Sequence, residues 1–261
     1  MKFFDCFMYH DEDLVLDIRL NILNQYINKF VIIESRFDHQ GNKKKLNFNF
    51  SNYIKFKDKI IYKIIDKFPP NFSDWERENY QRNFIINGLN EASDDDYILI
   101  SDVDEIPDLS KIRNYKKFKF TIFEQKMFYY KVNLLNNTYP IWNGTKMCKK
   151  KYLKSPQWLR NQKVKKNSFW KFYRIKWNFV KDGGWHFSFL MDTKKIKKKI
   201  KAFAHSEFNN SYFTNSKKIK DSVNKRLDLF DRKYEYKIIK LNKTFPKYIL
   251  ENKNKFKKWI I

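Results

Sequence analysis

Apolar and polar positions alternate in blocks along the first third of the chain. Residues 2–9 and 30–33 are short, nearly continuous apolar runs, the pattern of strands that are buried on both faces of a parallel sheet. Between them, residues 12–29 carry apolar side chains at intervals of four from Leu14 to Tyr26, which predicts a helix with a wide buried face. The three segments together predict a βαβ unit.

The alternation continues as far as residue 101. Residues 60–65 and 97–101 predict two more strands, and residues 75–91 predict a helix between them, capped by Ser73 or Asp74. This order of elements is typical of an α/β fold, a Rossmann-like, mostly parallel central sheet flanked by helices. In such sheets ligands bind outside the carboxyl ends of the strands.

Beyond residue 107 the pattern changes to longer, aromatic-rich segments. They predict mixed or antiparallel additions to the same sheet, at residues 119–135, 145–153, 169–177 and 185–190. Residues 193–203 predict a helix whose lysines form a solvated face, and residues 216–261 predict basic helical segments.

Net charge adds a competing interpretation. The 55 cationic and 29 acidic residues leave +26, which favours nucleic acid or another anionic polymer as a partner. However, 46 of the cations are Lys and only 9 are Arg, and Lys accompanies abundant Asn, Ile, Phe and Tyr, the mixture that an AT-rich coding sequence produces. No helix-turn-helix, zinc-finger or RRM pattern is present. Nucleic-acid binding therefore stays open as the alternative function.

The cysteines and the lengths of the apolar runs indicate where in the cell the protein is located. Cys6 and Cys148 are too few for a disulfide framework or a structural zinc site, and they suit a reducing compartment. No apolar run approaches the roughly 18 residues that cross a bilayer, and the first fourteen residues carry four acidic side chains. These features predict a cytoplasmic protein without a membrane span.

An acidic segment stands out in this basic chain. Residues 94–108 contain seven acidic side chains and no basic one. Asp102 and Asp104 directly follow an apolar strand, so their side chains point the same way while Val103 packs inward. Two neighbouring carboxylates repel unless a cation lies between them, and hard oxygen ligands suit Mg²⁺ or Mn²⁺ bridged to a diphosphate. The segment therefore predicts a metal site that bridges to a diphosphate.

Several ordered motifs carry a family resemblance. They are DCFMYHDEDLVLDIRLNIL at 5–23, FVIIES at 30–35, RENYQRNFIINGL at 77–89, DDDYILISDVDEIP at 94–107, GGWHFSFL at 183–190 and AHSEFN at 204–209. Together they resemble glycosyltransferase family 17, the family of the enzymes that add bisecting GlcNAc. The resemblance implies a GT-A fold, an inverting transfer from a UDP-sugar with UDP-GlcNAc as the expected donor, a glycan or other hydroxyl acceptor, and Mn²⁺ or Mg²⁺ as cofactor. The chain is most similar to the short soluble bacterial and viral members.

The resemblance also suggests an organisation of the chain. We expect one GT-A catalytic domain over residues 1–261, since 261 residues without a linker or repeat suit a single α/β domain. Residues 1–107 would bind the nucleotide-sugar, residues 108–210 would hold the acceptor and metal side, and residues 211–261 would form a basic helical segment.

Candidate ligands of the metal and donor follow. Asp102 and Asp104 are expected at the metal, with Asp102 also reaching the donor, and His186 after a flexible diglycine is expected to complete the shell, with His205 as its competitor. The expected donor-binding residues lie in two groups: Glu34 and Ser35 at the end of a strand, and Arg77 and Arg82 on the helix before the acidic segment. A surface ion pair between Glu78 and Arg82 is the alternative for Arg82.

An inverting transfer also needs a base that removes the acceptor's hydroxyl proton. Glu207 and Asp182 are the expected candidates, in that order, with Glu124 third. Trp142, Trp158, Trp177 and Trp185 could stack on sugar rings, although burial in the core is the simpler expectation. A nucleotide-binding scaffold without catalysis is the least favoured function.

Overall fold

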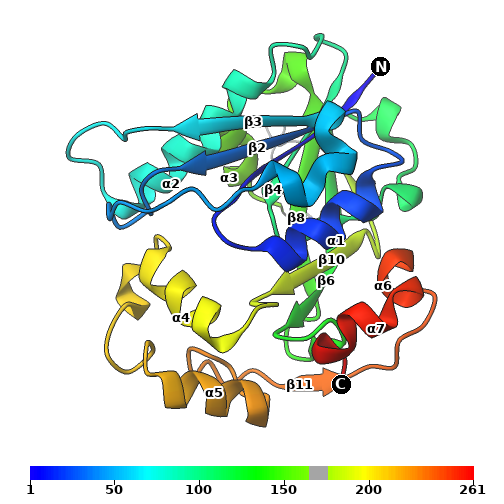
Figure 1. The fold of residues 1–261 in the computed structure, drawn as a ribbon. Helices are drawn as coiled ribbons and strands as arrows, with labels where there is room; N and C mark the ends of the chain where they lie inside the picture. Colours follow the sequence, from blue (N-terminus) through cyan, green and yellow to red (C-terminus); the bar gives the residue numbers. More distant parts are fainter. Residues whose placement is uncertain (165–175) are drawn as a thin grey trace, which may run out of the picture.

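The computed structural model describes residues 1–164 and 176–261, in which eleven strands join in one sheet (Figure 1). The strands are β1 (Phe3–Met8), β2 (Lys29–Ser35), β3 (Ile60–Ile65), β4 (Tyr97–Asp102), β5 (Glu105–Pro107), β6 (Phe120–Tyr129), β7 (Leu134–Asn136), β8 (Ile141–Lys149), β9 (Trp177–Val180), β10 (Gly184–Ser188) and β11 (Tyr236–Ile238). The helices are α1 (Asp13–Leu23), α2 (Asp74–Asn83), α3 (Pro156–Asn161), α4 (Thr193–Ala202), α5 (Ser216–Lys225), α6 (Lys247–Glu251) and α7 (Lys253–Phe256).

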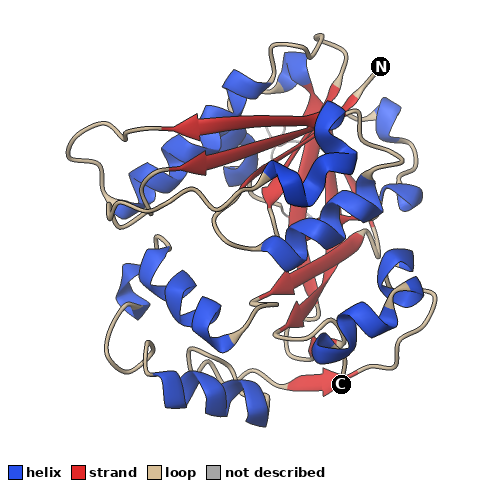
Figure 2. Cartoon of the chain, viewed as in Figure 1, coloured by secondary structure: helices blue, strands red, loops and turns tan. Residues whose placement is uncertain are grey.

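The predicted parallel half is confirmed. The main path of the sheet runs β11-β7-β6-β8-β4-β1-β2-β3, and the pairs β4-β1, β1-β2 and β2-β3 are all parallel. Alternate residues of these strands enter two apolar clusters: Phe7 and Ile32 face the α1 side, and Cys6 and Val31 face the opposite side. Helices accordingly lie on both faces of the sheet (Figure 2). Burial on both faces explains the continuous apolar runs in the sequence.

The predicted mixed character of the second half is also confirmed. β8 runs antiparallel to both β4 and β6, while β9 and β10 run parallel to β6. β10 additionally pairs antiparallel with the short strand β5, which lies at the end of the acidic segment. This pairing brings His186 opposite Glu105. An α/β fold with one mixed sheet results.

Several predicted boundaries were wrong. The strand predicted at 119–135 is two strands, β6 and β7, because Tyr130 takes a left-handed backbone conformation with φ of 61° that ends β6. The strand predicted at 145–153 starts earlier, at Ile141, and ends at Lys149.

The predicted helices are shorter than expected. α1 ends at Leu23, and α2 ends at Asn83, where a 3-10 helix (Phe84–Gly88) takes over. Gly88 lies so close to β2 that a Cβ there would meet Val31 Cγ1 at 2.3 Å.

The basic C-terminal part contains a strand, β11, besides its helices. Most of the strand predicted at 169–177 lies outside the described residues.

The helix α4 lies across the loops that follow β1 and β2. The amide of His39 donates to the carbonyl of Ala202 at the end of α4, and Lys195 reaches Asp11 at 2.8 Å. Figure 1 shows α4 packed beside α5 at this end of the sheet. Within the described residues, no helix is long and apolar enough to cross a membrane.

Candidate functional site

A cavity of about 380 Å³ lies at the carboxyl ends of the parallel strands. It is lined by the loops after β1 and β2, by part of residues 102–105, here called the acidic turn, and by α4 with the segment that follows it. These parts contribute His10, Glu12, Asp38, His39, Asp102, Asp104, Lys199, Phe203 and His205. The cavity occupies the place at which α/β sheets bind ligands.

A buried arginine holds the acidic turn in place. Arg19 on α1 is fully buried and pairs with Asp5 on β1, with Nη2 at 2.5 Å from Oδ1. Its Nη1 donates to the carbonyl oxygens of Asp102, Val103 and Glu105 at 3.0, 3.1 and 2.8 Å. Val103 itself packs into the core, as predicted. The backbone of the turn is therefore tied to the first βαβ unit.

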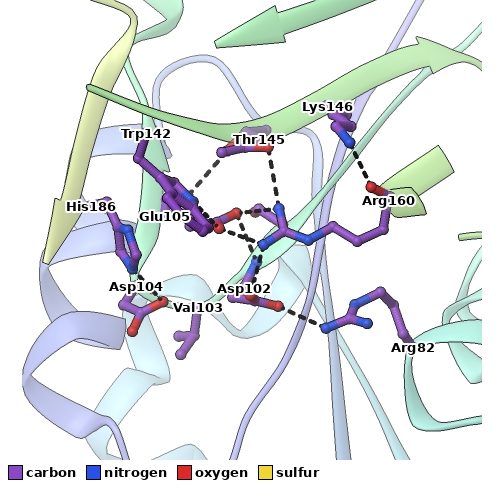
Figure 3. A network of polar contacts seen from close by, with 12 residues as sticks. Arg82, Asp102, Val103, Asp104, Glu105, Trp142, Thr145, Lys146, Arg160 and His186 are labelled. Atoms are coloured by element: carbon purple, nitrogen blue, oxygen red, sulfur yellow. Dashed lines mark hydrogen bonds and ion pairs between the residues drawn. The ribbon is translucent and has the colours of Figure 1, made fainter. Parts of the chain in front are cut away.

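The carboxylate of Asp102 faces two arginines. Its oxygens accept from Arg82 at 3.0 Å and from Arg160 on α3 at 2.9 Å (Figure 3). Burial acts to raise the pKa of Asp102, but the two guanidinium groups outweigh it and hold this pKa well below its usual range. Arg82 also pairs with Glu78 at 2.8 Å, so Arg82 combines the helix ion pair with a position at the cavity.

Glu105 lies buried beside Asp102 and Arg160. Its side chain is fully buried and accepts from Arg160 at 2.5 and 2.8 Å. The indole N–H of Trp142 on β8 also donates to Glu105, at 2.6 Å (Figure 3). A buried carboxylate needs such partners, because an unpaired charge in the interior is strongly destabilising. Glu105 thus links the acidic turn to α3 and β8.

Asp104 also lines the cavity but points away from the two arginines, so the expectation that the two carboxylates point the same way was wrong. Its Oδ1 lies 3.6 Å from His186 Nε2, and its Oδ2 lies 3.4 Å from the Lys199 ammonium on α4. Lys199 also contacts Glu12 at 3.2 Å. Burial alone would lower the pKa of Lys199, but Asp104 and Glu12 raise it above its usual range. The two aspartates of the turn therefore have different partners in this structure.

These side chains fit part of a divalent metal shell. Asp104 offers carboxylate oxygens and His186 an imidazole nitrogen, ligands that Mn²⁺ accepts, while Mg²⁺ and Mn²⁺ both take phosphate oxygens and water for other positions. The His186 Nδ1 is a buried nitrogen without a hydrogen-bond partner among the described residues. Over that same part of the chain, no three His, Cys, Asp or Glu side chains are already gathered for a metal ion. A metal here would need donor phosphates to complete its shell.

The two predicted residues at the end of β2 lie beside the cavity and not in its lining. Glu34 is fully buried and accepts from Lys44 Nζ at 2.6 Å and from the Tyr62 hydroxyl at 2.8 Å. Ser35 Oγ accepts from the amide of Phe37 at 3.0 Å. These contacts hold the loop after β2 against the sheet. They give both side chains a structural role that does not require a bound donor.

Arg77, like Glu34 and Ser35, lies beside the cavity and not in its lining. It donates to the carbonyl oxygen of His39 at 3.0 Å and pairs with Asp74 at 3.1 Å. Because His39 lines the cavity, Arg77 supports the cavity wall from behind.

The three predicted bases are spread over the molecule. Asp182 lies in an exposed turn with its carboxylate 3.5 Å from Lys126. Glu124 is buried in β6. Glu207 is exposed and accepts from His205 Nδ1 at 2.7 Å. None of the three carboxylates lines the cavity, but His205 does, so Glu207 is one hydrogen bond from it.

His205 was also the competitor of His186 for the metal. Its ring packs against Trp75 and Phe203, with a centroid distance of 4.7 Å to Trp75, and its hydrogen bond goes to Glu207. None of these partners belongs to the acidic turn, whereas His186 Nε2 lies 3.6 Å from Asp104 Oδ1.

A second cavity of about 370 Å³ adjoins the first and shares His10, Asp38, Lys44 and Ala202 with it. The exposed face of α4 supplies most of its other lining residues, which are Lys194, Lys197, Lys198 and Lys201, with Asn42 opposite. We call this second cavity the basic groove. Asp38 is the acidic residue in its lining.

Sequence reasoning missed three cationic partners of the acidic turn, which are Arg19, Arg160 and Lys199. Arg19 sits within the apolar pattern of α1, and an arginine on a buried helix face is a signal that could have been used. Arg160 and Lys199 carry no such signal, because their partners lie 58 and 95 residues away in the chain.

Comparisons with known proteins identify the family of the chain. The chain is 32% identical to the β-1,4-mannosyl-glycoprotein 4-β-N-acetylglucosaminyltransferases of Homo sapiens and Rattus norvegicus and 31% identical to that of Mus musculus, in each case over 108 residues. The match covers 38% of this chain and only 20% of each relative. The sequence profile described as "Glycosyltransferase family 17" matches residues 1–260, and the chain therefore belongs to glycosyltransferase family 17, a family of glycosyltransferase enzymes.

Proposed function

We propose that this protein is a metal-dependent, inverting glycosyltransferase of the GT-A type. It would transfer a sugar, with GlcNAc as the expected sugar, from a UDP-sugar to a hydroxyl of a glycan or other acceptor. The observation that carries the proposal is the acidic turn, which opens onto a cavity at the carboxyl ends of parallel strands in a family 17 chain. Its relatives are named as N-acetylglucosaminyltransferases, which supports the choice of GlcNAc.

Asp104 and His186 would hold the metal, with Asp102 on its donor side. A bound Mn²⁺ or Mg²⁺ supplies stabilisation of the charge that develops on the departing diphosphate. Around it, Arg82 and Arg160 keep Asp102 ionised and add positive charge near the phosphates. The Lys199 ammonium contacts both Asp104 and Glu12 and offsets part of their negative charge.

The acceptor hydroxyl must lose its proton as it attacks the anomeric carbon from the side opposite UDP. Glu207 is the first candidate for the base, because its partner His205 lines the cavity. Asp182 is the second candidate, and its exposed position requires the acceptor to extend toward the turn before β10. Attack from the opposite side inverts the configuration at the anomeric carbon.

The test measures UDP released from UDP-GlcNAc with Mn²⁺, with Mg²⁺ and with EDTA. Activity should require the metal, and Asp104→Ala should lose at least about 100-fold in turnover while keeping its fold. Asp95→Ala is the matched control, since Asp95 lies in the same acidic segment but pairs with Lys149 and Lys151 on the surface. Full activity in Asp104→Ala, or equal activity in EDTA, would remove the metal from the mechanism. A panel of UDP- and GDP-sugars then identifies the donor.

The basic groove favours a second candidate, in which the acceptor is an anionic polymer such as modified DNA. The groove adjoins the cavity, so an acceptor leaving the cavity along α4 would meet its lysines. Retention on DNA without any UDP-sugar turnover would instead favour a nucleic-acid-binding protein. Binding constants measured over a range of salt concentrations separate these cases, because each phosphate contact steepens the dependence.

A further inference from the structure

Trp142 is an exposed tryptophan inside the larger cavity. Its side chain lines the cavity and remains 38% exposed, whereas Trp177 and Trp185, two other candidates for sugar stacking, are buried in the core. A large aromatic face in contact with water costs free energy that a ligand can recover by covering it. Trp142 therefore offers an uncovered apolar surface at the candidate active site.

The ring is held firmly although it is exposed. Its indole N–H donates to Glu105 at 2.6 Å, and Glu105 is fixed in turn by two hydrogen bonds from Arg160 (Figure 3). Because Glu105 is fully buried, its position tolerates little displacement. The orientation of the ring is thus set before any ligand arrives, which lowers the entropy cost of binding.

The position of the ring identifies the part of a ligand that it would meet. The Trp142 and His186 ring centroids are 5.2 Å apart, and His186 faces Asp104. Figure 3 shows Trp142 and His186 side by side above the acidic turn. A nucleotide-sugar whose diphosphate lies at this turn carries its sugar directly on the second phosphate. A pyranose presents a face of C–H groups, which is attracted to the negative face of an indole ring.

We propose that Trp142 is the stacking platform for the transferred pyranose of the donor, a role that rests on the proposed function. The platform contacts the sugar and not the nucleotide. Binding of UDP-GlcNAc should therefore depend on Trp142, and binding of UDP alone should not.

The experiment is isothermal titration calorimetry of UDP and of UDP-GlcNAc, each with Mn²⁺, against the full chain and its variants. Trp142→Ala should weaken UDP-GlcNAc about tenfold, the equivalent of about 1.4 kcal/mol, and change UDP less than about twofold. Trp142→Phe keeps an aromatic face and should stay within about threefold of the wild type for both ligands. Tyr139→Ala is the matched control, because Tyr139 is an exposed aromatic just before β8 that does not line the cavity. It should leave both affinities unchanged.

Thermal unfolding of each variant checks that the fold is kept. If Trp142→Ala does not fold, Trp142→Leu carries the test, because it keeps apolar bulk but removes the flat aromatic face, and it should weaken UDP-GlcNAc selectively as Trp142→Ala does. In whichever of these two variants carries the test, equal weakening of UDP and UDP-GlcNAc, or no change in either, would overturn the assignment of Trp142 while leaving the transferase intact. Failure of the wild-type protein to bind both ligands would overturn the proposed function itself.

Discussion

Arg19 shows how one side chain controls the geometry of the acidic turn. Its guanidinium group has partners on β1, on β4 and on the turn, all within the interior. The interior accepts the charge because Asp5 neutralises it and carbonyl oxygens satisfy the remaining N–H groups. Arg19 therefore couples folding of the first βαβ unit to placement of Asp102 and Asp104.

Substitution of Arg19 by Met should be strongly destabilising. It would leave the Asp5 carboxylate buried without a counter-charge, and we expect a loss of about 3–5 kcal/mol in the free energy of unfolding. Urea denaturation followed by circular dichroism measures the change. A loss below about 1 kcal/mol would contradict the buried ion pair.

The double variant Asp5→Leu/Arg19→Met separates stability from activity. Removing both charges should restore part of the stability, because no unpaired charge remains in the interior. Activity should stay low, since the carbonyl oxygens of the turn no longer have their common donor.

His10 gives the protein a pH dependence of stability. Burial is the main cause that lowers the pKa of His10 from its usual 6.5 to about 4. The nearby Glu12 carboxylate raises this pKa, and the positive charges of Lys44, Lys198 and His39 lower it further. Below pH 6.5 the unfolded chain therefore takes up a proton at His10 that the folded chain does not take up until about pH 4. Stability should fall as the pH falls through this window.

The variant His10→Asn tests this contribution. The decrease in the free energy of unfolding between pH 6.5 and pH 4 should be smaller in the variant by about 1–3 kcal/mol, because Asn does not titrate. Glu12, whose pKa is held at about 2 by Lys199, by His10 and by backbone amides against the effect of burial, adds a further decrease as the pH falls from about 4.5 toward 2, mostly below the window of His10. Identical pH profiles would show that His10 is protonated equally in the folded and unfolded chains.

Among single residues, sequence alone could place the two aspartates, Arg82 and His186 near one another, but it could not identify Arg160 and Lys199. Placement after an apolar strand was enough to put Asp102 and Asp104 at the cavity and Val103 in the core. The separation of the two carboxylates, one toward Arg160 and the other toward Lys199, depends on how α3 and α4 pack. Such long-range packing has no local signature in the chain.

At the scale of elements, the segment before His186 differs from the flexible diglycine that was predicted. Gly184 begins β10 with φ of 134°, and a Cβ there would lie 2.1 Å from the carbonyl oxygen of Ile106. The glycine is needed because β10 approaches β5 too closely for a side chain. Close packing, and not flexibility, positions His186.

Gly184→Ala should therefore separate β10 from β5. We expect a loss of at least about 2 kcal/mol in stability, since both the backbone conformation and the contact with Ile106 are incompatible with a Cβ. Donor turnover should fall with it because His186 moves away from Asp104. Lys181→Ala, at an exposed position in the preceding turn, is the control, and a Gly184→Ala variant with the melting temperature of that control would refute the close approach.

The elements also show which parts of a fold can be predicted from patterns. Strands β1, β2 and β4 were predictable because burial on both faces leaves nearly continuous apolar runs. The break between β6 and β7 was not, because the apolar character continues through Tyr130 and only its left-handed φ of 61° marks the turn. The strand β11 was missed because it is short and largely exposed and owes its conformation to pairing with β7.

At the scale of the whole molecule, the charge of +26 has two explanations that the structure helps to separate. A lysine-rich composition spreads cations over the entire surface, whereas a bound anionic acceptor requires cations gathered at one place. The basic groove is such a place, and it adjoins the cavity that contains the acidic turn. Among the described residues, His10 is the one aromatic side chain that lines the groove, which disfavours stacking of nucleic-acid bases there.

Two triple variants with the same net charge decide between these explanations. Lys194→Gln/Lys197→Gln/Lys201→Gln removes three lysines of the groove, and Lys111→Gln/Lys116→Gln/Lys117→Gln removes three exposed lysines outside it, so both proteins carry 26 − 3 = +23. On a heparin or DNA column, an organised groove predicts that the first variant elutes at clearly lower salt than the second. Its plot of log K against log salt should also be shallower, by about 0.9 for each duplex phosphate that the substituted lysines no longer neutralise. Equal elution would mean that the surface acts as a uniform cationic layer, because only total charge would then determine binding, and the acceptor of the transferase would not need to be anionic.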